Sequence, residues 1–226
     1  MTINVFIISA PSGSGKSTLV NEVRRTVPDL EFSISYTTRS PRGSEQDGCE
    51  YFFISRDQFE EMIRRDEFLE HAEVFGNYYG TSRSFLRKAE KANKDLLLDI
   101  DVQGAEQIKA KLPEAVSIFI MPPNRSELEK RLRGRSQDAE PVIQRRLKAA
   151  GREIENYRKY DYILVNDRLE DSVDALEAVL LSERLTRKGR PDANLTEQAE
   201  KCRLDHTGER IQQILKSFGE TAASGQ

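Results

Sequence analysis

The chain has 226 residues, 37% of them hydrophobic and 32% charged, and a formal net charge of −3 from 35 basic and 38 acidic side chains. This length suffices for one α/β domain with small insertions, and no apolar run reaches the roughly 20 residues that a membrane-spanning helix needs. The acidic excess argues against nucleic acid as the main ligand, since proteins that bind it usually carry a basic surplus. The distant cysteines, Cys49 and Cys202, indicate a reduced, cytoplasmic protein without a disulfide framework.

The first third of the chain alternates between apolar runs and helical periodicity. Residues 3–8 predict a buried strand, residues 19–27 repeat at helical spacing until Pro28, and residues 32–35 predict a second strand. The following segment, 36–81, is expected to be a mostly β insertion. Within it we expect a loop over 36–50, strands over 51–54 and 68–75, and a helix around 59–63.

The alternation continues to about residue 188, and it favours a parallel sheet with helices on both faces. Beyond that point the composition is polar, and a weaker apolar stripe through residues 195–218 predicts one extra amphipathic helix. Predicted strands cover 95–100, 116–121 and 162–165, and predicted helices run through 85–89, 105–112, 128–132, 143–157 and 173–180.

The most specific local pattern is Ala10-Pro-Ser-Gly-Ser-Gly-Lys-Ser17, which lies between a predicted strand and a predicted helix. This context is typical of a phosphate-binding P-loop, and the alternative is a glycine-rich turn. Gly13 and Gly15 would let backbone N–H groups curl around phosphate oxygens, Lys16 would bridge the β- and γ-phosphates, and Ser17 would ligate Mg²⁺. The expected ATP contacts here are Ala10, Pro11, Ser12, Gly13, Ser14, Gly15, Lys16, Ser17 and Thr18.

Four further segments follow in order: Ser35-Tyr-Thr-Thr-Arg-Ser-Pro-Arg42, residues 47–53, residues 68–81, and Leu96-Leu-Leu-Asp-Ile-Asp-Val-Gln-Gly104. With the P-loop, they resemble the bacterial enzymes of the guanylate kinase family from the first strand to about residue 187. The resemblance implies an α/β P-loop kinase fold, a parallel sheet core flanked by helices with a GMP-binding insertion and a helical lid. It also implies phosphoryl transfer from Mg-ATP to GMP and dGMP in purine nucleotide metabolism, giving ADP and GDP.

The family's GMP site has two parts, a phosphate grip and a base site. Arginines and tyrosines hold the phosphate, and guanidinium forks suit it because they bind bidentately. A carboxylate accepts hydrogen bonds from guanine N1–H and N2–H₂, and such pairing can reject adenine by roughly 10⁴. A solvated surface charge or a half-exposed strand residue is the alternative reading of these positions. The family's residues match Ser35, Arg39, Arg42, Tyr51, Glu70, Tyr79, Thr81 and Asp101.

The resemblance also assigns the remaining polar side chains of the ATP site. Asp99 ends an apolar strand and is expected to hold Mg²⁺ through water or to orient Lys16, with capping of the next turn as the alternative. Asn166 matches an adenine-side contact, although asparagine is also common in turns. The departures from the usual patterns are Ala10 in place of the first P-loop glycine, a loop glycine at Gly43, displaced by one residue, and Ser136 in place of glycine.

The lid is expected over about residues 126–148, where the family's arginines match Arg131, Arg135 and Arg146. Arg133 and Arg145 are expected to be plain charges on the helix surface. No catalytic base is needed, because the acceptor is already an anionic phosphate oxygen; alignment and charge stabilisation suffice, with closure of the insertion and the lid. The expected catalytic residues are Lys16, Arg39, Arg131, Arg135 and Arg146.

The expected organisation is a core of residues 1–35 and 82–188, an insertion over 36–81 and a C-terminal extension over 189–226. Two other functions stay open. A guanylate-kinase-like phosphopeptide-binding module would have a degraded P-loop and lid, and a kinase of another phosphorylated small molecule would lack Glu70 and Asp101. The partners expected are ATP and GMP, with no nucleic acid and no membrane; self-association is left open.

Overall fold

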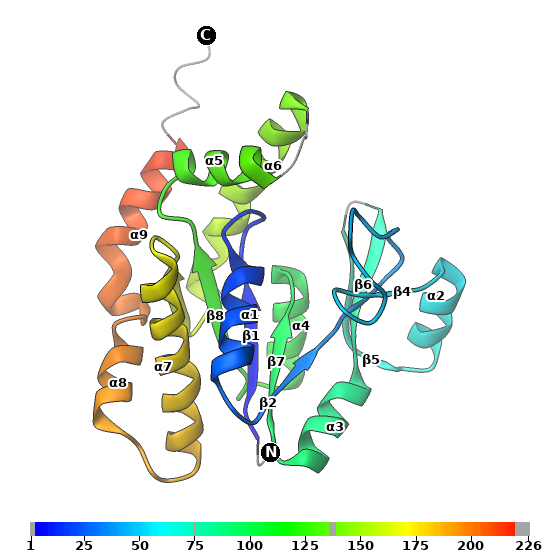
Figure 1. Cartoon of the computed structure of the whole chain (residues 1–226), viewed down its shortest axis with the longest axis horizontal. Helices are drawn as coiled ribbons and strands as arrows, with labels where there is room; N and C mark the ends of the chain where they lie inside the picture. Colours follow the sequence, from blue (N-terminus) through cyan, green and yellow to red (C-terminus); the bar gives the residue numbers. More distant parts are fainter. Residues whose placement is uncertain (1–2, 75, 136–138, 220–226) are drawn as a thin grey trace. The chain divides into compact units, whose positions relative to one another are not determined.

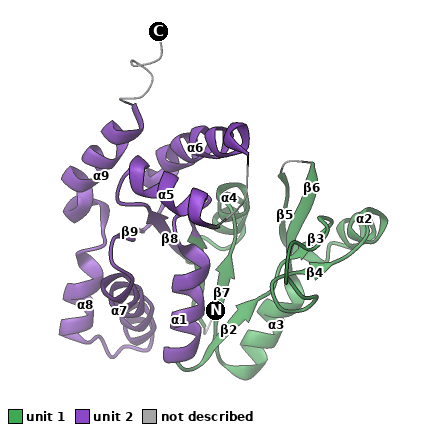
Figure 2. Cartoon of the chain, turned by 45° about the horizontal axis from the view of Figure 1, so that its top comes forward, with its two compact units in different colours: residues 1–8, 28–116 green, residues 9–27, 117–226 purple. Residues whose placement is uncertain are grey.

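A computed structural model describes residues 3–74, 76–135 and 139–219 of a mixed α/β chain (Figure 1). The chain divides into two compact units, one of residues 1–8 and 28–116 and the other of residues 9–27 and 117–226 (Figure 2). In the described part of the chain, no helix is both long and apolar enough to span a membrane.

A five-stranded sheet with the order β2-β7-β1-β8-β9 forms the core of the fold, and the fold class predicted from the sequence is confirmed. The pairs β2–β7, β1–β7 and β8–β9 are all parallel. Their apolar runs are buried because helices cover parallel sheets. The strands are β1 (Val5–Ser9), β2 (Leu30–Ser33), β7 (Asp95–Asp99), β8 (Val116–Met121) and β9 (Tyr162–Val165).

A four-stranded sheet with the order β4-β3-β6-β5 lies within the first unit. Phe59 is fully buried there and stacks on Phe68 and Tyr78, with ring centroids 4.4 Å and 5.2 Å away. A capping box of Ser55 and Gln58 starts the helix that carries Phe59. The elements are β3 (Tyr36–Thr37), β4 (Phe52–Phe53), α2 (Arg56–Arg64), β5 (Phe68–Val74), β6 (Asn77–Ser82), α3 (Arg83–Ala92) and α4 (Val102–Lys111).

Two of these strands were not predicted. The expected loop over 36–50 begins with β3, and the segment after the predicted strand over 68–75 contains β6. Their pairing partners are distant in sequence, since Tyr36 lies opposite Gly80 and Ala72 opposite Tyr79. Residue 75, the end of that predicted strand, lies outside the described residues.

The second unit is largely helical. Its helix α6 shows the predicted stripe, with Ile143, Leu147, Ala150 and Ile154 buried and Pro141 in the first turn. The described elements besides β8 and β9 are α1 (Lys16–Thr26), α5 (Arg125–Arg135), α6 (Glu140–Ile154), a 3₁₀ helix (Glu155–Lys159), α7 (Leu169–Arg187), α8 (Ala193–Glu200) and α9 (Leu204–Gly219).

The single C-terminal helix predicted from the apolar stripe is wrong, because the extension contains two helices, α8 and α9. Between them the chain turns beside the sheet, where the carbonyl of Cys202 accepts a 2.7 Å hydrogen bond from the Ile163 N–H of β9. Because the Cys202 carbonyl bonds to β9, it is not part of a helix, and the helix ends there. The apolar spacing continues in α8 and in α9, so the sequence pattern does not show this interruption.

Candidate active site

Residues 10–17 join β1 to α1 in a tight loop that depends on two glycines. Gly13 and Gly15 have φ angles of 93° and 90°, which side-chain-bearing residues rarely adopt, and Gly15 is the N-cap of α1. The N–H of Ser14 donates to the Pro11 carbonyl at 3.1 Å and closes the turn. A Cβ on Gly13 would lie 2.8 Å from Leu132 Cδ2, so α5 packs directly against the bare backbone.

Two residues assigned to ATP by the resemblance hold this loop through its backbone. The side-chain amide of Asn166 donates to the Ser14 carbonyl at 2.7 Å, and Arg131 Nη1 donates to the same oxygen at 3.4 Å. Arg131 also donates to the Asn166 carbonyl at 3.0 Å. A Cβ on Gly15 would lie 2.2 Å from Asn166 Nδ2, so only glycine fits there. The loop conformation is thus fixed by α5 and by the residue that follows β9.

The hydroxyls of the loop differ in what they contact. Ser14 is fully buried, and its Oγ has no hydrogen-bond partner among the described residues. Because such an orphaned donor costs free energy, a phosphate oxygen is a suitable partner for it. Ser12 Oγ accepts a 2.7 Å hydrogen bond from Arg146 Nη2, and Ser17 is exposed. The side chain of Arg135, the third expected lid arginine, lies outside the described residues.

In the first unit, strand pairing places Glu70 directly opposite Thr81. Glu70 is only 4% exposed, and its Oε1 accepts a 2.6 Å hydrogen bond from Thr81 Oγ1. Asp101 is the N-cap of α4 and accepts from the Gly104 N–H at 2.8 Å. Burial raises the pKa of Glu70 to about 7; the Thr81 hydrogen bond opposes this effect, and the nearby charge of Asp101 adds to it. Glu70, Thr81 and Asp101 are therefore brought together.

Gly104 limits the space around this carboxylate. A Cβ on Gly104 would lie 3.4 Å from Asp101 Oδ1 and only 2.6 Å from Glu70 Oε2. The second distance is shorter than a Cβ atom tolerates in a packed interior. Glycine is therefore required in the first turn of α4, although its helix propensity is poor. Sequence reasoning missed this residue, because the contact depends on where β5 lies.

Arg39 is the centre of a second cluster in the same unit. It is 9% exposed and forms a bidentate ion pair with Glu45, at 2.9 Å and 3.0 Å. Its guanidinium lies 5.3 Å from the ring of Tyr51, which meets the ring of Tyr79 edge-on at 5.8 Å. Burial alone would lower the pKa of Arg39, but hydrogen bonds to Glu45 and Tyr79 outweigh burial and raise it.

Glu45 was not assigned a role from the sequence. Its carboxylate also accepts from the Arg42 N–H at 2.8 Å, so it holds both predicted phosphate-binding arginines, one by side chain and one by backbone. Partial burial would raise the pKa of Glu45, but the hydrogen bonds from Arg39 and Arg42 hold it below its ordinary value. The side chain of Arg42 is exposed. The sequence signal that could have indicated this pairing is the acid Glu45, six positions after Arg39 in the same loop.

The remaining predicted residues lie at strand ends. Ser35 is half-buried between β2 and β3, and its carbonyl accepts from the Phe52 N–H at 2.9 Å. Asp99 is the half-buried last residue of β7, and the cap of the following helix is Asp101 instead. No group of three or more His, Cys, Asp or Glu side chains in the described ranges could hold a metal ion. A magnesium ion bound mainly by phosphates and water needs no such group.

Comparison with known proteins shows which proteins the chain is similar to. A sequence model of the guanylate kinase family matches residues 2–183. The chain is 57% identical over 225 residues to the guanylate kinase of Koribacter versatilis (strain Ellin345), covering 96% of this chain and 97% of the relative. It is 51% identical over 183 residues to that of Escherichia coli (strain K12), covering 80% and 88%. The solved guanylate kinase of Anaplasma phagocytophilum has a TM-score of 0.67 at 33% identity, over 89% of this chain and 96% of its own.

Proposed function

Since the chain belongs to the guanylate kinase family, it is a nucleoside monophosphate kinase that transfers a phosphoryl group from ATP to GMP, and we propose the residues that do so. The P-loop of the second unit binds ATP, and the clusters around Glu70 and Arg39 in the first unit bind GMP. The observation that carries this assignment is the buried carboxylate of Glu70 beside the Thr81 hydroxyl. It accepts from both guanine N1–H and N2–H₂, whereas N1 of adenine is itself an acceptor and cannot pair with it.

The ATP side supplies positive charge around the phosphates. Backbone N–H groups of residues 13–18 and the start of α1 bind the phosphate oxygens. Lys16 bridges the β- and γ-phosphates, and the Ser14 hydroxyl donates to one of their oxygens. The contacts of Arg131 and Arg146 with Ser14 and Ser12 support a role for both at the transferring phosphoryl group. Arg135 is assigned the same role from the resemblance alone, and Asn166 holds the loop beside the adenine.

The GMP side orients the acceptor. Arg39, Arg42, Tyr51 and Tyr79 bind the GMP phosphate, and the base is read by Ser35, Glu70, Thr81 and Asp101. An oxygen of that phosphate attacks the γ-phosphorus of ATP. The bond between the γ-phosphorus and the β–γ bridging oxygen breaks, so that GDP forms and ADP leaves. No proton has to be removed from the acceptor, which explains why no histidine or acid is needed as a base.

Mg²⁺ fits the oxygen donors available for it. We assign it to the hydroxyl of Ser17 and, through water, to the carboxylate of Asp99, both hard ligands of the kind that Mg²⁺ prefers. When bound, the ion neutralises charge on the β- and γ-phosphates. The free thiols Cys49 and Cys202 support a reducing, cytoplasmic location. We also retain the predicted organisation, with residues 36–81 as the GMP-binding insertion and 126–148 as the lid.

The alternative of a phosphopeptide-binding module is not favoured, because it would have a degraded P-loop and lid. Here the P-loop is present, and two lid arginines, Arg131 and Arg146, donate hydrogen bonds to it. One assay tests the function directly, namely ADP formation measured in parallel with GMP, dGMP, AMP and UMP as acceptors. Turnover is expected with GMP and dGMP, and AMP should be disfavoured by roughly 10⁴ in kcat/KM. Absence of turnover with GMP, or equal use of AMP, would contradict the proposal.

A further inference from the structure

The helix α9 lies outside the family match, which ends at residue 183, yet it packs on elements that carry the ATP site. It contacts α5, α6 and β9, and Figures 1 and 2 show it beside α5 in both views. Arg131 belongs to α5, Arg146 to α6, and Asn166 directly follows β9. Among the described residues of this unit, α5, α6 and β9 carry or directly precede a side chain that holds the P-loop, and all three are in contact with α9.

An apolar contact links the end of α9 to the P-loop. Phe218 packs against the core between α5 and α6, and a Cβ on Gly151 would lie 3.6 Å from its ring. Two members of this core, Leu128 and Leu132, also face the P-loop, since a Cβ on Gly13 would lie 3.0 Å and 2.8 Å from them. Phe218 therefore supports the same leucines that shape the loop. The core consists of Leu128, Leu132, Ile143, Leu147 and Ala150.

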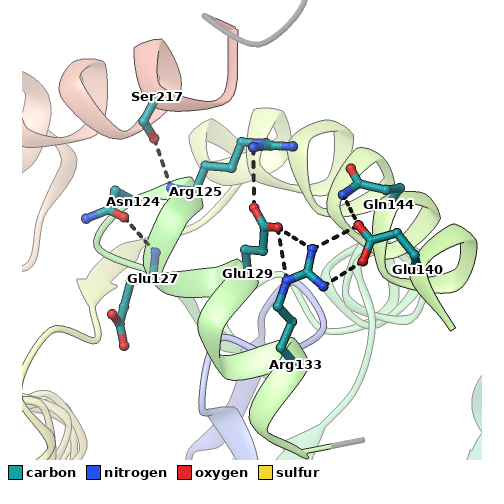
Figure 3. Close-up of polar contacts among 8 residues, drawn as sticks. All are labelled: Asn124, Arg125, Glu127, Glu129, Arg133, Glu140, Gln144 and Ser217. Carbon is teal, nitrogen blue, oxygen red and sulfur yellow. Dashed lines mark hydrogen bonds and ion pairs between the residues drawn. The ribbon is translucent and has the colours of Figure 1, made fainter. Parts of the chain in front are cut away.

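A polar contact joins α9 to the first turn of α5 (Figure 3). Ser217 Oγ accepts a 3.1 Å hydrogen bond from the Arg125 N–H and donates to the Ile214 carbonyl at 2.6 Å. The first N–H groups of a helix have no partner within the helix. Asn124 caps the Glu127 N–H at 2.8 Å, and Ser217 serves another of these groups from a different helix. The start of α5 is thereby tied to α9.

From Arg125 a chain of ion pairs continues into α6 (Figure 3). Arg125 lies 3.6 Å from Glu129, which pairs at 2.7 Å with Arg133. Arg133 forms two hydrogen bonds, of 2.6 Å and 2.8 Å, with Glu140 at the start of α6. Arg133 is exposed on the surface of α5, as predicted, and its charge is paired with both acids. A single exposed pair contributes little, but this bidentate network joins two helices.

A third contact of α9 lies beside Asn166. Arg210 pairs with Asp167 at 2.7 Å, and both side chains are more than half exposed. Exposed pairs of this kind contribute little to stability on their own. The contact nevertheless brings α9 against the segment after β9, where Asn166 donates to the Ser14 carbonyl.

From these contacts we infer that α9 is a positioning element of the ATP site, in which Ser217 and Phe218 hold α5 and α6 so that Arg131 and Arg146 stay against the P-loop. The inference rests on the proposed function, because its readout is the use of ATP. It concerns one unit only and predicts no change in GMP binding. The described contacts of Ser217 and Phe218 are with α5, α6 and α9 itself, so both act on the P-loop through other residues.

The test compares Phe218→Ala and Ser217→Ala with the wild-type chain. Misplaced phosphate-binding groups should raise the KM for ATP and lower kcat, on the order of 10- to 100-fold in kcat/KM for Phe218→Ala and less for Ser217→Ala. The dissociation constant of GMP, measured by calorimetry without ATP, should stay unchanged. Phe218→Leu and Ser217→Thr should restore most of the activity, because they keep the apolar volume and the hydroxyl.

Two controls separate positioning from stability. Gln212→Ala changes an exposed residue of α9 and should have no effect. Leu180→Ala leaves a cavity beside α7, where Leu180 is fully buried, and should lower the melting temperature without raising the KM for ATP. If Phe218→Ala lowers the melting temperature and leaves kcat and both KM values unchanged, α9 is only structural and the inference is wrong. Should Phe218→Ala fail to fold, an unchanged KM for ATP in Ser217→Ala overturns the inference. A wild-type chain without turnover would instead refute the proposed function.

Discussion

The hydroxyl of Thr81 donates a 2.6 Å hydrogen bond to the carboxylate of Glu70, which strand pairing buries to 4% exposure. Burial raises the pKa of this carboxyl to about 7, and the charge of Asp101 adds to the effect. The group therefore changes its charge close to neutral pH. Because guanine donates two hydrogen bonds from its Watson–Crick edge, the ionised form is the one suited to bind it.

GMP affinity should accordingly depend on pH through Glu70. We expect the dissociation constant of GMP to fall as pH rises through about 7 and to level off above it. Glu70→Gln should lose this dependence together with part of the preference for GMP over AMP. The GMP phosphate titrates near pH 6, so the measurement is the ratio of the two proteins' dissociation constants from pH 5.5 to 8.5, taken by calorimetry. A flat ratio would remove Glu70 from the base site.

The raised pKa of Glu70 also predicts that the folding stability of the nucleotide-free protein depends on pH. Folding raises the pKa of Glu70 from 4.5 to about 7, so its contribution to stability is fully present below 4.5 and is lost as pH rises through 7. A shift of this size corresponds to roughly 3 kcal/mol. The free energy of unfolding of the wild-type chain should fall by about that amount relative to Glu70→Gln between pH 4.5 and 8. Parallel curves for the two proteins would contradict the raised pKa.

Gly104 is expected to set the position of Glu70. Gly104→Ala would place a methyl group 2.6 Å from Glu70 Oε2, so the carboxylate or α4 has to move. We expect the KM for GMP to rise on the order of tenfold or more and the GMP-to-AMP selectivity to fall, since small displacements weaken oriented contacts strongly. Gly208→Ala is the matched control, because a Cβ there meets no atom within 4 Å. Equal kinetics for the two variants would show that the site adapts to the methyl group.

Glu45 is expected to position the two arginines that we propose to bind the GMP phosphate, Arg39 and Arg42. Glu45→Gln removes the charge that compensates the nearly buried Arg39 and weakens the acceptor of the Arg42 N–H. Hydrogen bonds to charged groups contribute about 1.5–3 kcal/mol, so the KM for GMP should rise roughly tenfold or more. The KM for ATP should not change. Glu50→Gln serves as control in the same loop, because the described hydrogen bond of Glu50 is with the Gln46 N–H and not with an arginine.

Local sequence features predicted the parts of the site that are formed locally. The P-loop could be read from eight consecutive residues, because its glycines, lysine and serine act within one turn of chain. Strands β8 and β9 were predicted with the bounds that they have, since a fully buried strand is a continuous apolar run. The strand β6 was missed, because its pairing with β5 rather than its composition makes it a strand.

Contacts between distant segments could not be predicted in this way. Nothing near Gly104 in sequence indicates that Glu70 lies against it, and the ion pair of Arg39 with Glu45 depends on the path of an irregular loop. The apolar spacing of Phe218 predicted a helix but not its partner, which is the core between α5 and α6. The resemblance ended near residue 187, so it gave no guide to α9.

Asn166 provides the last prediction, on the ATP side. Its amide donates to the Ser14 carbonyl at 2.7 Å, and its own carbonyl accepts from Arg131, so it is the buried link between β9, α5 and the P-loop. Asn166→Ala leaves the Ser14 carbonyl without its best donor, at a cost of about 1–3 kcal/mol of folding stability.

The KM for ATP should rise in Asn166→Ala, while the dissociation constant of GMP stays constant. Asn166→Asp should be worse, because a carboxylate would then lie beside the Ser14 carbonyl and near the ATP phosphates. Asn156→Ala is the control, since Asn156 also donates to backbone carbonyls, but only within its own helical segment. An unchanged KM for ATP in both Asn166 variants would mean that the P-loop keeps its conformation without this link, and that its glycines and Leu132 suffice to shape it.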